Sequence, residues 1–273
     1  MKKIVMTLGV ILAAGAAFAQ GPYATFGLGY AGSSNGEMIG SKTTTVGVNV
    51  TSSNINGTFG AGIPIHLSGG YMLNKHVGVE LGLTYLMGSE ITIEEETSDA
   101  AFGVLESITK TKGSSIRISP MLVLTTGGEK LSLYSKLGVI IPVSGKTTFA
   151  QSASVDLGGG IQKVEIEGES VGKFSMGFTA AIGVSFPIAD NLSVFGELHM
   201  VNLRIKANTR TLTLATVDGV DNLSGMDKQD IETEYVDEVL PTDNTDVKQP
   251  LKELGNSSNY NSFGINVGVK MTF

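Results

Sequence analysis

The 273-residue sequence contains no cysteine, and only 16% of its residues are charged. Without cysteine there is no disulfide framework, no thiolate-ligated metal and no lipidated N-terminal cysteine. The net charge of -7 excludes the basic surface expected of a nucleic-acid-binding protein. Long apolar runs are scarce as well. Beyond the N-terminal segment no stretch reaches roughly 18 consecutive apolar residues, so the sequence predicts no transmembrane helix.

The N-terminus predicts a cleaved export signal. Lys2 and Lys3 precede an apolar run from Ile4 to Ala17, and Ala17-Phe18-Ala19 has the small-x-small pattern of a cleavage site. At about 15 residues the run is short for a membrane anchor, which needs roughly 20. We therefore expect residues 1–19 to be a signal peptide and residues 20–273 to form the mature, exported domain.

Glycine is abundant, with 36 residues, and apolar residues alternate with small or polar ones. The C-terminal stretch 262–273 shows this alternation throughout. Its apolar members are Phe263, Ile265, Val267, Val269, Met271 and Phe273. A period of two over this length indicates a β-strand with one apolar and one polar face. Taken alone, such a strand fits a soluble sandwich or a membrane barrel whose apolar face contacts lipid.

Eight alternating segments and the connections between them decide between these folds. The segments lie at about 23–30, 59–73, 77–88, 116–124, 131–144, 174–186, 192–200 and 262–273. Short turns follow the second, fourth and sixth segments, whereas long polar connections cover 31–58, 89–115, 145–173 and 203–261. A sandwich does not explain this alternation of loop length, but a barrel with one end in the periplasm does. The sequence predicts an all-β fold, a closed antiparallel transmembrane β-barrel with short periplasmic turns and long extracellular loops.

The number of strands stays open between eight and ten. Residues 43–51 alternate through Val46, Val48 and Val50, and residues 212–217 alternate in the same way. Each stretch would either extend a strand beyond the membrane or add a hairpin to the barrel.

The export signal, the eight alternating segments, the loop asymmetry and the terminal Phe273 resemble the small outer-membrane β-barrels of Gram-negative bacteria. That family includes the OmpA transmembrane domain, OmpX and OmpW. The resemblance covers about residues 20–273 and rests on pattern, not on a diagnostic motif. It implies a location in the bacterial outer membrane and contact with outer-membrane lipid. It also implies that Phe273 is recognised by the barrel-assembly machinery.

The face opposite the lipid stripe carries the candidate functional residues. They are Glu80, Arg117, Lys136, Glu197 and Lys270, together with His66 and His199. The interior of an eight-stranded barrel is just wide enough to be filled by side chains, and unpaired buried charge is costly. We therefore expect a paired polar plug in which Glu80 bonds Arg117 and shares Lys136. A gated ion path is the alternative. Lumen glycines such as Gly27 and Gly268 also leave room for a cavity that binds apolar molecules.

The sequence does not support a catalytic site. His199 is followed by Met200 and Val201, so Val201 stands where the His-x-Ser pattern of lipid A deacylases has serine. We expect no enzyme activity, no cofactor and no metal. The acidic stretch from Asp218 to Asp246 matches no calcium loop. It is expected to be a solvated segment, with weak divalent-cation binding as the alternative.

These observations predict a non-catalytic outer-membrane barrel with a structural or surface-interaction role. A small channel or transport path for ions or apolar molecules is the alternative, and a lipid-modifying enzyme ranks third. The sequence does not identify an extracellular partner.

Overall fold

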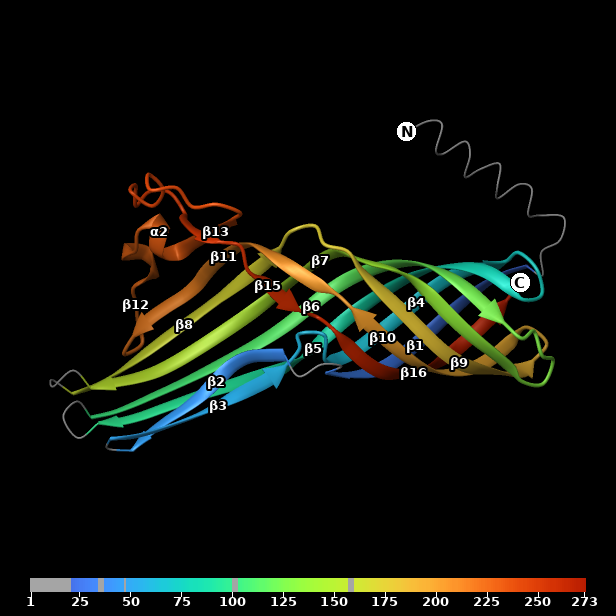
Figure 1. Ribbon diagram of the computed structural model, residues 1–273, viewed down its shortest axis with the longest axis horizontal. Helices are drawn as coiled ribbons and strands as arrows, with labels where there is room; N and C mark the ends of the chain where they lie inside the picture. The colour runs from blue at the N-terminus through green and yellow to red at the C-terminus, as the bar shows by residue number, and fades with distance from the viewer. Residues whose placement is uncertain (1–20, 34–36, 47, 100–102, 157–159) are drawn as a thin grey trace.

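The computed structural model describes residues 21–33, 37–46, 48–99, 103–156 and 160–273. The predicted signal peptide, residues 1–19, lies outside the described residues. The described chain is almost entirely antiparallel β-structure (Figure 1). Within it, no helix is both long and apolar enough to cross a membrane.

Eight strands close into a barrel. They are β1 (Gly21–Ser33), β4 (Gly62–Met72), β5 (Val77–Asp99), β6 (Gly103–Thr125), β7 (Ser132–Asp156), β9 (Gly177–Ala189), β10 (Leu192–Asn202) and β16 (Ser262–Thr272). Tyr23 of β1 is opposite Gly70 of β4 on one side and Thr272 of β16 on the other, which closes the wall. The predicted eight-stranded antiparallel barrel is confirmed. The alternative of ten barrel strands is wrong.

The two faces of the wall follow the alternation of the sequence. On β5, the outward side chains of Leu81 and Leu83 are 59% and 43% exposed, while Glu80 and Thr84 on the inner face are buried. The same division repeats around the barrel. A continuous belt of exposed apolar side chains is stable in lipid and not in water. The outer face of the barrel is therefore its membrane surface.

Beyond the barrel, β5, β6 and β7 continue as an open sheet on the extracellular side (Figure 1). These strands have 23, 23 and 25 residues, about twice the 9–11 residues that cross a bilayer. Next to β5 lies the hairpin of β2 (Glu37–Val46) and β3 (Asn49–Gly57). Beyond β7 come β8 (Ile161–Gly172), β11 (Arg204–Val217), β13 (Glu232–Val236) and β14 (Leu251–Leu254). Among the described strands, β3 and β14 each pair on one side only, so they form the two open edges.

Short elements complete the outer end of the molecule. They are β12 (Val220–Asp221), the 3-10 turn η1 (Leu223–Gly225), the single-turn helix α2 (Lys228–Ile231) and β15 (Ser257–Asn259). β12 and β15 both pair with β11, which holds the last long connection against the sheet.

The long connections expected as polar loops are in fact largely strands, so that expectation is wrong. Most described residues of the outer sheet are at least partly exposed on both faces, so its strands need no continuous apolar face. Threonine, valine and isoleucine still favour extended backbone there. The alternating stretches 43–51 and 212–217 lie in the β2–β3 hairpin and in β11, outside the barrel.

A filled lumen as the candidate functional site

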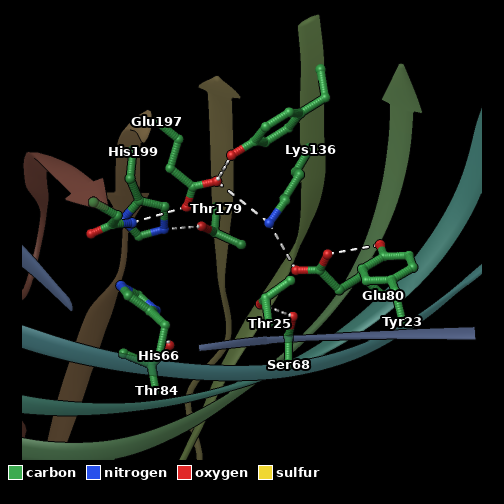
Figure 2. A network of polar contacts seen from close by, with 12 residues as sticks. Tyr23, Thr25, His66, Ser68, Glu80, Thr84, Lys136, Thr179, Glu197 and His199 are labelled. Carbon is green, nitrogen blue, oxygen red and sulfur yellow. Dashed lines mark hydrogen bonds and ion pairs between the residues drawn. The ribbon is translucent and has the colours of Figure 1, made fainter. Parts of the chain in front are cut away.

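Lys136 is the centre of an ion cluster inside the barrel. Its Nζ lies 3.0 Å from Oε1 of Glu80 and 3.4 Å from Oε2 of Glu197. Figure 2 shows the ammonium group between the two carboxylates, which come from opposite parts of the wall. The three side chains are between 2% and 10% exposed. A buried cluster of this kind is stable only when its remaining polar atoms are also hydrogen-bonded.

Neutral donors satisfy the carboxylates. The Tyr23 hydroxyl donates to Oε2 of Glu80 at 2.8 Å, and the Tyr134 hydroxyl donates to Oε2 of Glu197 at 2.9 Å. Nδ2 of Asn266 donates to Oε1 of Glu197 at 3.0 Å. All four carboxylate oxygens thus accept from a donor, counting the contacts with Lys136. The network joins β1, β5, β7, β10 and β16, so it braces the wall from within.

Aromatic rings fill the space that the lumen glycines leave. Phe195 points into the lumen and is 8% exposed, whereas Val194, Leu198 and Met200 of the same strand face outward. A Cβ added at Gly27 would lie 3.1 Å from the Phe195 ring, and one at Gly268 would lie 2.7 Å from it. Glycine at these two positions leaves the space that the Phe195 ring occupies. The alternative that these glycines leave a ligand cavity is therefore wrong at these two positions.

Lys270 lies at the periplasmic end of the cluster. Its Nζ is 4.1 Å from the centre of the Tyr23 ring, within cation–π distance. A cavity of about 170 Å³ opens on this side, lined by Tyr134, Lys136 and Lys270 among others. Lys270 therefore joins the network through an aromatic ring and not through a carboxylate.

The two lumen histidines form a second layer. Nδ1 of His66 lies 2.8 Å from Oγ1 of Thr84, and Nε2 of His199 lies 2.8 Å from Oγ1 of Thr179. Their rings meet edge to face with centres 5.4 Å apart. Figure 2 shows the two rings facing each other beside Glu197.

Arg117 does not bond to Glu80, so the predicted Glu80–Arg117 pair is wrong. Arg117 is opposite Thr84 on β5, whereas Glu80 is opposite Met121. Four residues along a strand separate these levels by about 13 Å. Nε of Arg117 donates instead to Oγ of Ser115 at 2.8 Å. Among the described residues, Lys136 is the only cation that forms an ion pair with Glu80.

Apolar side chains cover the lumen toward the extracellular side. Leu86, Ile140, Val201, Leu203 and Tyr260 form a buried cluster, with Phe59 and Ile205 packed against it. The guanidinium of Arg117 lies 5.5 Å from the centre of the Tyr260 ring. Side chains thus occupy the lumen from Lys270 at its periplasmic end to this apolar cluster, the outer cover, at its extracellular end.

The predicted site residues separate into three groups. Glu80, Lys136 and Glu197 are in direct contact, His66 and His199 form their own pair, and Arg117 and Lys270 each contact an aromatic ring. Three further members of the network were not predicted from the sequence, namely the hydroxyls of Tyr23 and Tyr134 and the amide of Asn266. Their inward position in the alternation was the available signal. In the described part of the chain no three His, Asp or Glu side chains converge in a way that would hold a metal ion.

A lateral groove lies where β7 leaves the barrel wall. β7 pairs with β9 as far as Ile140 and with β8 from Lys146 onward. The groove has a volume of about 800 Å³. Its lining combines lipid-facing Ile116, Ile141 and Phe174 with Tyr260 of the outer cover and with lysines 146, 173 and 206.

One family model agrees with this architecture. Residues 4–224 match the family model described as outer membrane protein beta-barrel domain. No curated protein matches the chain. Among solved structures, Neisserial surface protein A is 13% identical with a TM-score of 0.42, covering 93% of this chain and 99% of that one. OprG from Pseudomonas aeruginosa is 13% identical with a TM-score of 0.39, covering 94% and 97%. Ail of Yersinia pestis is 11% identical with a TM-score of 0.32, covering 93% and 100%.

Proposed function

Because the chain belongs to the outer-membrane β-barrel domain family and lies in the bacterial outer membrane, we propose that it is a non-catalytic barrel that presents a β-sheet at the cell surface. The observation that carries this proposal is the continuity of β5, β6 and β7. They run without interruption from the membrane wall into the open outer sheet (Figure 1).

This continuity favours a rigid, surface-directed structure. Strands of 23 to 25 residues span about 75–80 Å, and roughly half of that length extends beyond the bilayer. The extension carries exposed ion pairs, such as Lys42–Glu94 and Lys110–Glu90. A polar sheet with solvent on both faces offers hydrogen bonds and charge for surface contacts. It offers little apolar area for burial.

The filled lumen supports a barrel that does not conduct. Reconstituted into planar bilayers, the wild-type protein should show no unitary current steps. A conducting porin inserted at the same protein-to-lipid ratio is the control. Reproducible steps from the wild type would replace the proposal with the channel alternative.

The display role has its own test. Replacing residues 91–111 with Asn-Gly joins Glu90 to Lys112 by a two-residue turn and removes the outer part of β5 and β6. The shortened protein should remain heat-modifiable on unboiled gels, because its barrel is intact. Cells that carry it should lose binding to surfaces that the wild type contacts. Unchanged binding, at equal surface abundance, would contradict the proposed role of the sheet.

We also propose that Phe273 serves the assembly of the barrel. Its side chain is 70% exposed, and its backbone N–H donates to the carbonyl of Pro22 at the seam between β1 and β16. An exposed ring at the closing seam is accessible to the assembly machinery. Phe273→Ala should slow insertion in cells, while refolding into pure lipid vesicles should proceed at nearly the wild-type rate. Equal delays in both settings would show a purely structural role.

The lateral groove favours a second candidate function. It joins lipid-facing side chains to the outer cover of the lumen, so an apolar molecule from outside would reach the membrane through it. Ile141→Arg places a charge in the groove and should block such a path. Equal uptake of an apolar dye by vesicles with wild-type, variant or no protein would exclude this candidate.

A further inference from the structure

Arg117 is the one charged side chain of the described lumen that has neither an ion pair nor a place in the lining of the periplasmic cavity. It is 2% exposed, whereas Lys270 opens onto the periplasmic cavity. Its Nε donates a hydrogen bond to Oγ of Ser115, and the Tyr260 ring lies against the guanidinium. Nη2 is buried without a hydrogen-bond partner. A guanidinium in this state is strongly destabilising unless something else balances its charge.

The charges inside the wall do not balance on their own. Three cations, Arg117, Lys136 and Lys270, accompany two anions, Glu80 and Glu197, which leaves one excess positive charge with both histidines neutral. The two glutamates cannot serve Arg117, because their oxygens are already engaged with Lys136, the tyrosines and Asn266. In the described lumen Lys270 also lacks an ion pair but borders the periplasmic cavity, so the uncompensated buried charge is located at Arg117.

A cavity adjoins this cation. It has a volume of about 40 Å³ and is lined by Arg117, His66 and His199, among others. Glu80, Glu197 and Lys136 also border it, but these three side chains are engaged with one another. One buried water needs about 10–15 Å³ of such a volume, so the cavity holds about three waters or one small, partly hydrated ion.

A second unpaired group faces the same space. Nε2 of His66 is buried and makes no hydrogen bond of good geometry, although the Asn266 side chain lies nearby, while Nδ1 contacts the hydroxyl of Thr84. When that hydroxyl donates to Nδ1, Nε2 carries the ring proton and is a free donor. Two unsatisfied buried donors, one of them positively charged, then line one cavity.

We propose that this cavity holds a halide ion, bound by the guanidinium of Arg117 and the imidazole of His66. A monovalent ion matches the single excess charge. A compact, spherical acceptor fits the volume, whereas a divalent oxyanion such as sulfate would overfill it and reverse the net charge. The low dielectric of the membrane-embedded lumen strengthens the attraction between the ion and the guanidinium.

Bromide locates the ion directly. Crystals of the wild-type protein grown in sodium bromide should show an anomalous difference peak in the cavity, next to Arg117 and His66. An ordered cavity that contains only water, with bromide confined to the exterior, would overturn the proposal. This measurement needs no variant, so it stands even where a substitution prevents folding.

The same site predicts an anion-dependent stability. Urea unfolding from lipid should occur at higher urea in sodium chloride or bromide than in sodium gluconate at equal ionic strength, because gluconate is too large for the cavity. Halide at ten times its dissociation constant raises the folding equilibrium constant about tenfold.

Arg117→Met should abolish the difference between halide and gluconate. Arg204→Met is the matched control. Arg204 is exposed and pairs with Glu37 outside the barrel, so its removal should leave the halide effect intact. A wild type that unfolds identically in all three salts would contradict the site, as would an Arg117→Met protein that keeps the full halide effect.

Discussion

The barrel and the outer sheet are built from the same three strands, β5, β6 and β7, yet opposite rules govern their side chains. In the barrel the outward face is apolar and the inward face holds ions, glycines and rings. In the outer sheet both faces are mostly polar. The barrel wall is closed, whereas the sheet ends in the edges β3 and β14. The same extended backbone runs from the barrel into the outer sheet. The pattern of side chains is therefore set by the surrounding medium, lipid or water, and not by the strand conformation.

The difference extends to charge. Lys136 and its two glutamates are at most 10% exposed, and every carboxylate oxygen has a donor. Lys42 and Glu94 form a pair of similar length, 3.1 Å, but about half of each side chain is exposed. Water and mobile ions screen the exposed pair far more than the buried cluster. Ion pairs of similar length therefore have different interaction free energies in the barrel and in the outer sheet.

Removing the central cation should have the largest effect. Lys136→Met leaves Glu80 and Glu197 buried without their shared counter-charge, and we expect a loss of about 3–5 kcal/mol in the free energy of unfolding. Lys42→Met in the outer sheet should cost about 0–1 kcal/mol. Urea unfolding from lipid vesicles measures both.

A double-mutant cycle sharpens this comparison. Glu80→Gln removes one of the two carboxylates, so it should cost less alone than Lys136→Met and should partly rescue it. Strictly additive effects of the two substitutions would show that the side chains do not interact.

Truncating the inward ring should have a similar or slightly smaller effect. Phe195→Ala empties the space beside Gly27 and Gly268, at a cost of about 3–5 kcal/mol. Phe178→Ala, on the lipid face of β9 and 68% exposed, should cost less because lipid chains refill the gap. The same unfolding assay compares the two variants. Equal losses would indicate that the lumen is not packed around Phe195.

An arginine on β5 tests the position of the membrane boundary. Leu83→Arg puts a charge near the middle of the lipid belt and should cost about 2–4 kcal/mol. Thr92→Arg lies farther along the same strand, between Glu90 and Glu94 on one face, and should change stability by no more than about 0.5 kcal/mol. Folding yield in vesicles distinguishes them. Similar yields would place the boundary beyond Thr92 or show that Leu83 does not face lipid.

The smallest expected effect is a local change on protonation of Asp243 in the outer region at low pH. Hydrogen bonds from Lys252 and from the Leu240 backbone N–H lower the pKa of Asp243. A lowered carboxyl pKa contributes stability above the ordinary value of about 3.8, and that contribution is lost as the pH falls through the lowered pKa. The Leu240 amide resonance should therefore shift below pH 4, while barrel resonances stay unchanged. In Asp243→Asn that titration should be absent.

The sequence predicted the barrel more completely than the sheet, for physical reasons. Lipid on one face and a narrow lumen on the other force a strict period of two, visible from Phe263 to Phe273. Solvent on both faces forces no period, so most of 89–115 resembled a loop. In the lumen, the sequence showed which residues point inward but not their axial level. The predicted Glu80–Arg117 pair was wrong for this reason, because the β5–β6 register places Arg117 opposite Thr84 and Glu80 opposite Met121.

The braced lumen also bears on how the chain folds. Tyr23 and Asn266 come from opposite ends of the sequence, and each donates to a glutamate that is 57 or 69 residues away, Glu80 and Glu197 respectively. Strand β1 becomes the neighbour of β16 only at the final seam, where Tyr23 is opposite Thr272. Contacts so distant in sequence form late and slowly. Because Asn266 of β16 donates to Glu197, pairing of the last strand also completes the donors around the ion cluster, and we expect the two events to occur together.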